Sequence, residues 1–104
     1  MEQVYGFEMI QPEKVREITA REKVLVIDLR SSESYRKGHI RNARNYPYEY
    51  IKEWSREIPD SVNLILYCEH GNQSLLAARK LRERKGKIYT ITGGYRQYQN
   101  LNRD

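Results

Sequence analysis

Three short, continuous apolar runs constrain the fold of this chain more than any other feature. They occupy residues 24–27, 64–67 and 88–91 and are rich in valine, isoleucine and leucine. Runs of this length without alternation are typical of strands buried on both faces, as in parallel sheets covered by helices. We also expect an edge strand within residues 5–10 and a short inner strand at residues 43–46.

Helical patterns separate these runs. The first begins near Pro12, the second covers residues 51–58 and the third, which is the clearest, covers residues 74–85. In the third, apolar residues recur at helical spacing, Leu76 widens the apolar face and Gly86 follows as a C-terminal cap. Strands that alternate with helices predict an α/β fold with a mainly parallel central sheet and helices on both faces.

Length and composition fit a single domain over residues 1–104. Apolar residues make up 38% and charged residues 32% of the chain. No apolar run approaches the roughly 20 residues of a membrane span. The first residues lack the basic head and apolar stretch of a signal peptide. We therefore expect a cytoplasmic protein without a membrane partner.

The formal net charge of +5 fits two interpretations. A basic surface can attract anionic substrates or acidic partners, although a solvated helix face is the simpler explanation of clustered charge. No nucleic-acid-binding motif accompanies the charge, so we expect no nucleic-acid partner. The single cysteine excludes an intramolecular disulfide and a cysteine-only metal cage, and the two histidines lie too far apart in sequence to suggest a zinc site.

Cys68 stands where a buried strand should pass through a tight loop into the clearest helix. In α/β folds, ligands bind beyond the carboxyl ends of such strands. Loop N–H groups and the start of the helix then form a cradle for an anion, which favours the thiolate of a cysteine placed there. Gly71 allows a positive φ in this loop, while Ser74 can cap the helix and turn its hydroxyl toward the sulfur. A buried, unreactive cysteine is the alternative, and spacing alone leaves both open.

Four short segments, taken together, resemble one known family. Any one of them is weak evidence, but their order and separations are similar to those of short, single-domain rhodanese-like proteins over about residues 4–98. The resemblance implies the rhodanese-like fold and sulfurtransferase activity. The segments are Asp28-Leu29-Arg30, Tyr35-Arg36-Lys37-Gly38-His39-Ile40 followed by residues 43–47, Cys68-Glu69-His70-Gly71-Asn72-Gln73-Ser74, and Gly93-Gly94 with Tyr98.

The resemblance also implies a reaction. The thiolate of Cys68 takes the outer sulfur of a small anionic donor, either thiosulfate or a persulfide or polysulfide, and becomes a persulfide. A thiol or cyanide, or an acceptor protein, then removes that sulfur, so one cysteine is sufficient. No metal and no organic cofactor are implied. The implied substrate-binding loop consists of Glu69, His70, Gly71, Asn72, Gln73 and Ser74.

Two positions depart from the family pattern. Many members have arginine where Gln73 stands, and glutamine donates hydrogen bonds without the positive charge that helps to hold an anionic donor. This weakens the expectation that thiosulfate is the donor, although some short members with a similar loop also lack the arginine. Asn42 replaces the usual glycine before Ala43, and asparagine tolerates left-handed backbone better than most residues.

We expect several residues near Cys68 to support the structure of the site without taking part in the reaction. We expect Asp28 to accept hydrogen bonds from loop amides, and Arg30 to form an ion pair with Asp28 or Glu33. His39 resembles the family's buried histidine and should hold a turn rather than act in catalysis. His70 can tune the thiolate or contact the substrate, but we expect it to face solvent, because the loop backbone provides the cradle.

Other functions remain open at this point. A non-catalytic interaction module can keep the fold without the activity, although the presence of Cys68 disfavours it. A dual-specificity phosphatase or an arsenate reductase also uses a cysteine loop, but phosphoryl chemistry needs a longer loop and normally a closing arginine. Gln73 and Ser74 leave this loop short and uncharged. If the acceptor is a protein, the basic residues from Arg79 to Lys87 can dock an acidic partner.

Overall fold

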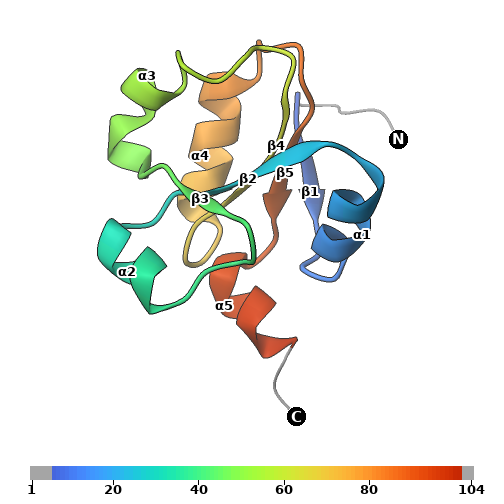
Figure 1. Ribbon diagram of the computed structural model, residues 1–104, viewed down its shortest axis with the longest axis vertical. Helices are drawn as coiled ribbons and strands as arrows, with labels where there is room; N and C mark the ends of the chain where they lie inside the picture. Colours follow the sequence, from blue (N-terminus) through green and yellow to red (C-terminus); the bar gives the residue numbers. More distant parts are fainter. Residues whose placement is uncertain (1–5, 102–104) are drawn as a thin grey trace.

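The computed structural model describes residues 6–101, in which five strands form one parallel sheet (Figure 1). The strand order is β1-β5-β4-β2-β3, and every pairing between neighbours is parallel. The prediction of a mainly parallel α/β sheet is therefore confirmed. The strands are β1 (Glu8–Ile10), β2 (Val24–Asp28), β3 (Arg44–Asn45), β4 (Asn63–Tyr67) and β5 (Ile88–Ile91). The helices are α1 (Lys14–Arg21), α2 (Ser32–Lys37), the 3-10 turn η1 (Tyr48–Tyr50), α3 (Ile51–Trp54), α4 (Asn72–Leu81) and α5 (Gly94–Asn100).

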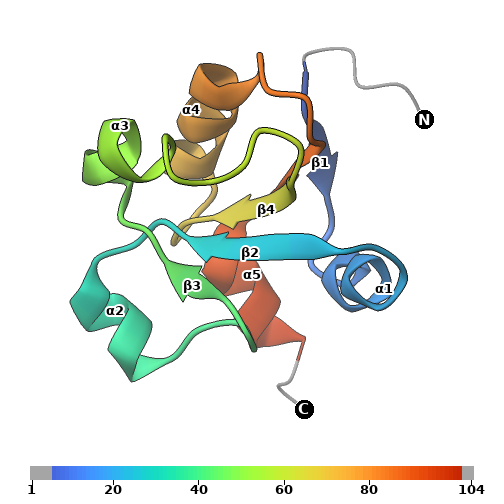
Figure 2. The same cartoon turned by 45° about the horizontal axis from the view of Figure 1, so that its top comes forward.

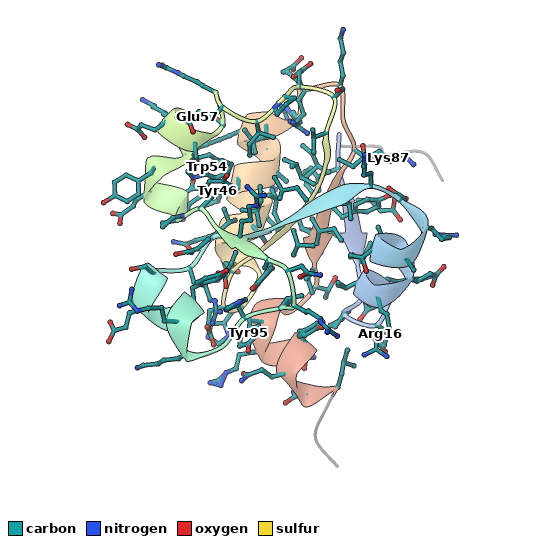
Figure 3. All side chains as sticks on the ribbon, in the orientation of Figure 1. Arg16, Tyr46, Trp54, Glu57, Lys87 and Tyr95 are labelled. Carbon is teal, nitrogen blue, oxygen red and sulfur yellow. The ribbon has the colours of Figure 1, made fainter. Side chains whose placement is uncertain are left out.

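The three predicted apolar runs form the three central strands. Their side chains alternate between two cores, one under α3 and α4 and the other under α1 and α5, and Figure 2 shows these helix pairs on opposite sides of the sheet. Leu64 and Leu66 enter the first core, where Tyr46 and Trp54 stack (Figure 3), while Ile65 enters the second. Burial on both faces explains why these strands read as continuous apolar runs.

The two edge strands differ in how well they were predicted. β1 lies at one edge, as expected, and begins at Glu8, whereas the start of the predicted segment at Tyr5 lies outside the described residues. The strand predicted at residues 43–46 forms as β3, but its expected inner position was wrong, because β3 lies at the opposite edge and pairs with β2 alone. The chain leaves β2 through α2 and returns on the outer side of β2.

α4 is displaced from its predicted range. It begins at Asn72 and ends at Leu81, and Leu76 is 46% exposed instead of widening the apolar face. Gly86 does not cap the helix, so that prediction was also wrong. Tertiary contacts hold the segment after the helix in a turn: the Arg84 guanidinium donates to the carbonyl oxygens of Pro59 and Val62, and the Gly86 N–H donates to the carbonyl of Asp60.

The remaining helices also depart from the sequence pattern. α3 ends at Trp54 instead of Ile58, because the next turn tightens and the Glu57 N–H donates to the carbonyl of Trp54. α2 and α5 were not predicted. α2 begins at Ser32, and the Oγ of the preceding Ser31 accepts the N–H of Ser34 at 3.2 Å, a standard N-terminal cap. No helix within residues 6–101 is long and apolar enough to cross a membrane.

Asn42 adopts the left-handed backbone expected from the sequence. Its φ is 68°, and the turn is closed by a 2.9 Å hydrogen bond from the Ala43 N–H to the carbonyl of Ile40. Asparagine tolerates this conformation, whereas a β-branched side chain is strained in it. The turn therefore keeps its geometry without the glycine that is usual in similar sequences.

Asn42→Val should lower the free energy of unfolding by about 1–2 kcal/mol, because valine is strained at positive φ. Asn42→Gly, which removes that strain, should stay close to the wild type. Urea denaturation of the three proteins measures both differences. Equal stability of the valine and glycine variants would contradict the left-handed assignment.

Candidate active site

Cys68 lies at the carboxyl edge of the sheet, directly after β4. The chain leaves β2 toward β3 and leaves β4 toward β5, so the connections of these two neighbouring strands diverge. In open α/β sheets such a divergence opens the crevice in which ligands bind. The Leu29 N–H still donates to the carbonyl of Tyr67 at 2.8 Å, so the two strand ends are fixed side by side.

The loop after β4 points two backbone N–H groups at the cysteine sulfur. Cys68 Sγ accepts the N–H of Gly71 at 3.1 Å and that of Ser74 at 3.4 Å. Gly71 has a φ of 106°, a left-handed conformation that curls the loop around the sulfur, as the sequence predicts. Donors fixed in this way stabilise negative charge on the sulfur. The side chain of Cys68 is buried, with an exposure of 3% for the residue.

Ser74 closes the loop but does not cap the helix, so that prediction was wrong. α4 begins two residues earlier, with Gly71 at its N-terminal cap. The Ser74 hydroxyl donates to the carbonyl of Gly71 at 3.2 Å, and it is the amide of Ser74 that bonds to the sulfur. Ser74 is fully buried, so the carbonyl of Gly71 satisfies a hydroxyl that water cannot reach.

The first turn of α5 holds the loop from the other side. The Tyr95 N–H donates to the carbonyl of Cys68 at 2.8 Å, and the Arg96 N–H donates to that of Glu69 at 3.1 Å. Gly93 and Gly94 both have positive φ, and a Cβ on Gly94 would lie 2.5 Å from the carbonyl oxygen of Cys68. The glycine pair thus allows the closest approach between α5 and the loop.

A buried ion pair lies beneath the loop. The Arg30 guanidinium binds both oxygens of Asp28, with Nε 3.0 Å from Oδ1 and Nη2 2.7 Å from Oδ2. The Tyr67 hydroxyl donates to Asp28 Oδ2 at 2.7 Å and accepts the N–H of Ile40 at 3.0 Å. The predicted pairing of Arg30 with Asp28 is confirmed, whereas Glu33 faces Lys37 at 4.0 Å.

Arg30 connects this pair to the loop. Its Nη1 lies 3.3 Å from Oε1 of Glu69, and its guanidinium lies over the ring of Tyr95 at 4.1 Å from the centroid. Among the described residues, the amide that donates to the Asp28 carboxylate is that of Arg30 itself, at 2.9 Å. Because Arg30 lies in the loop that follows β2, the prediction that Asp28 accepts a loop amide is confirmed, although no amide of the loop at residues 69–74 is its donor. Its link to that loop runs through the guanidinium.

Burial and charge fix the protonation of this network. Burial lowers the pKa of the Arg30 guanidinium, but the hydrogen bond and charge of Asp28 outweigh it and the pKa is raised overall. Burial raises the pKa of the Tyr67 hydroxyl, and the neighbouring Asp28 raises it further. Near neutral pH, Arg30 is therefore charged and Tyr67 remains a neutral donor.

The other predicted residues divide into two groups. His70, Asn72 and Gln73 are exposed on the loop and at the start of α4, close in sequence to the sulfur. His39 is exposed, so its predicted burial was wrong. Its ring stacks on Tyr35 at a centroid distance of 3.7 Å, and its Nδ1 lies 2.8 Å from the Tyr35 carbonyl oxygen. His39 thus holds the end of α2 and does not join the loop.

Comparison with known proteins identifies the family. The model of the rhodanese-like domain matches residues 11–101. The chain belongs to the rhodanese-like domain family. It is 29% identical over 90 residues to the thiosulfate sulfurtransferase GlpE of Pseudomonas putida strain F1, covering 86% of this chain and 82% of that protein. It is 29% identical over 80 residues to GlpE of Coxiella burnetii strain RSA 331, covering 76% of this chain and 75% of the relative.

The fold of a solved rhodanese-related protein from Thermoplasma volcanium is also similar. The TM-score is 0.83 at 22% sequence identity, and the match covers 92% of this chain and 94% of that one. This similarity confirms the rhodanese-like architecture.

Sequence reasoning missed two tyrosines that support the rhodanese loop. Tyr67 precedes Cys68 and points to the opposite core, and its hydroxyl binds Asp28. Tyr95 follows the glycine pair; its amide binds the Cys68 carbonyl and its ring underlies Arg30 (labelled in Figure 3). The sequence offered one signal for them, because Tyr67 is adjacent to the cysteine loop and Tyr95 is adjacent to the glycine pair. Within residues 6–101, no three histidine, cysteine, aspartate or glutamate side chains gather as metal ligands would.

Tyr67→Phe should lower the free energy of unfolding by about 1–3 kcal/mol near pH 8, because Asp28 and the Ile40 amide each lose a buried partner. The deficit should shrink as the pH rises above about 10. The folded wild type has a raised tyrosine pKa and must retain a proton that the unfolded chain releases, so its stability falls there. Urea denaturation from pH 8 to pH 11 measures the gap, and a constant gap would contradict this coupling.

Proposed function

We propose that this protein is a single-domain sulfurtransferase that carries sulfane sulfur as a persulfide on Cys68. The observation that carries the proposal is the pair of backbone N–H groups, from Gly71 and Ser74, directed at the cysteine sulfur. Relatives of this rhodanese-like chain in Pseudomonas putida and Coxiella burnetii are named thiosulfate sulfurtransferases, which supports the same activity here.

In the first step, the Cys68 thiolate attacks the outer sulfur of thiosulfate, a persulfide or a polysulfide. A new S–S bond forms, the S–S bond of the donor breaks, and its electron pair leaves with the departing group, which is sulfite when the donor is thiosulfate. The Gly71 and Ser74 N–H groups stabilise the attacking thiolate before the step. They need no reorganisation, because loop and helix already fix them.

In the second step, a thiophilic acceptor removes the outer sulfur. A thiolate or cyanide attacks that sulfur, the bond to Cys68 breaks, and the electron pair returns to the cysteine as a thiolate. The two steps form a ping-pong cycle that needs one cysteine and no change of net oxidation state in the protein. The loop amides receive the returning negative charge.

The charged side chains near the loop act by positioning it. Arg30 holds Glu69 and stacks on Tyr95, and neither Arg30 nor Asp28 bonds to the sulfur. Gln73, where many members have arginine, is exposed and uncharged. Arg30 is engaged by two carboxylates, and among residues 6–101 the groups that bond to the Cys68 sulfur are backbone amides and not a guanidinium. Phosphoryl chemistry normally needs a closing arginine, so this arrangement favours sulfur transfer over oxyanion hydrolysis.

Intact mass spectrometry tests the proposal. Reduced protein treated with thiosulfate or with polysulfide should gain one sulfur atom, and cyanide should remove it. The Cys68→Ala variant should gain none under the same conditions. If neither donor loads the native protein, the persulfide mechanism is contradicted and a non-catalytic interaction module becomes the better account.

Gly94→Ala should slow persulfide formation by about tenfold or more, because a Cβ there would force the carbonyls of Cys68 and Glu69 away and misplace the sulfur. Gly86→Ala is the matched control. Its Cβ would also meet a backbone carbonyl, that of Val62, but far along the chain from the loop. Both variants should be less stable, and equal loading rates at matched folded fraction would contradict the role of α5.

A further inference from the structure

One face of α4 is left uncovered directly beside the cysteine loop. The helix buries Ser74, Ala77 and Ala78 against the sheet. At 3.6 residues per turn, the residues on the opposite side share one exposed face. This α4 outer face consists of Asn72, Gln73, Leu76, Arg79 and Lys80, all exposed.

Within α4 itself, no acidic side chain offsets the positive charge of the α4 outer face. α4 contains no aspartate or glutamate. Among the described residues, no ion pair involves Arg79 or Lys80. Lys80 Nζ instead lies 5.0 Å from the ring centroid of Tyr48, which belongs to η1. Leu76 adds an exposed apolar side chain one helical turn from the loop.

Two basic side chains of the segment from Arg79 to Lys87, which we expected to dock an acidic partner, are engaged elsewhere in the fold. Arg84 turns to the carbonyl oxygens of Pro59 and Val62, and Lys87 pairs with Glu22 at 4.0 Å. Within α4, the charges nearest to the loop are those of Arg79 and Lys80.

On the other side of the loop, the positive charge is neutralised. Glu69 lies 3.3 Å from Arg30 and 3.9 Å from Arg96, and Arg30 is already paired with Asp28. An acidic partner that reaches the loop therefore gains little attraction from this side and more from α4.

The acceptor has to come onto the loop itself. Cys68 is 3% exposed, so an attacking thiol on a protein must approach closely, and its flanking residues must rest on the elements around the loop. α4 begins within that loop, at Asn72, so the outer face of the helix lies beside the approach to the sulfur.

We propose that the α4 outer face docks the protein that accepts sulfur from Cys68, a thiol protein with an acidic segment and an apolar side chain beside its reactive cysteine. The acidic segment lies on Arg79 and Lys80, and the apolar side chain lies on Leu76. This inference rests on the proposed sulfurtransferase function and names the partner of the same site.

A binding experiment tests the surface without the chemistry. The protein is the Cys68→Ser variant, and the probe is a fluorescent peptide with one serine, one leucine and four glutamates, compared with a peptide in which lysines replace the glutamates. At about 20 mM salt the acidic peptide should bind roughly tenfold more tightly, and the difference should shrink at about 200 mM salt. Equal binding of the two peptides would overturn the proposal.

Charge-reversal variants locate the site. Arg79→Glu with Lys80→Glu should reverse the peptide preference. Arg16→Glu with Arg41→Glu makes the same change in net charge, and Arg16 lies on α1, across the molecule from α4 (Figure 3). This control should keep the preference for the acidic peptide. If both double variants lose it equally, net charge and not the α4 outer face is responsible, and the proposal fails.

A transfer experiment connects docking to chemistry. With protein loaded as the Cys68 persulfide, the acidic peptide carrying cysteine in place of serine should remove sulfur roughly tenfold faster than its lysine counterpart at low salt. Arg79→Glu with Lys80→Glu should abolish that advantage and leave the rate with cyanide within about twofold, because Arg79 and Lys80 do not contact the sulfur. An unchanged advantage would overturn the proposal. Failure to load sulfur would instead contradict the proposed function, and the binding experiment would still decide whether the face takes an acidic partner.

Discussion

The buried pair of Asp28 and Arg30 connects the strand ends to the loop that holds Cys68. Asp28 is fully buried and Arg30 nearly so, and removing one partner of such a pair leaves an uncompensated charge that costs about 3–5 kcal/mol. The Tyr67 hydroxyl satisfies the same carboxylate from the neighbouring strand. The same Arg30 guanidinium that neutralises Asp28 also pairs with Glu69 and lies over the ring of Tyr95. The buried ion pair therefore helps to fix the position of the loop.

The cradle around the sulfur is made of backbone, which explains how a short chain can build it. Two N–H groups reach Cys68 because Gly71 turns the loop and α4 starts immediately after it. The carbonyls on the outer side of the same loop are taken by the amides of Tyr95 and Arg96. Because the cradle consists of backbone amides, it does not depend on the side chain at position 73. Gln73 in place of an arginine removes a positive charge beside the loop and leaves these amides in place.

The sequence was sufficient for features that depend on local physics. Continuous apolar runs identified the central strands, and the position of Cys68 between a strand and a helix identified the cradle. Features set by tertiary contact were not predictable. α4 ends early because Arg84 and Gly86 bind the loop before β4, β3 lies at an edge because of the path of the chain, and His39 is exposed because it stacks outside Tyr35. The link from Arg30 through Glu69 to the loop spans 39 residues, and no local pattern encodes it.

The central claim is that the amides of Gly71 and Ser74 hold an anionic sulfur on Cys68. Amide proton and nitrogen chemical shifts, recorded by NMR before and after loading with polysulfide, test it most directly. The account predicts that the largest changes occur at Gly71 and Ser74 and that cyanide reverses them, while the amides of α1 and β1 stay in place. Sulfur loading that leaves the Gly71 and Ser74 amides unchanged, with larger shifts elsewhere, would contradict it.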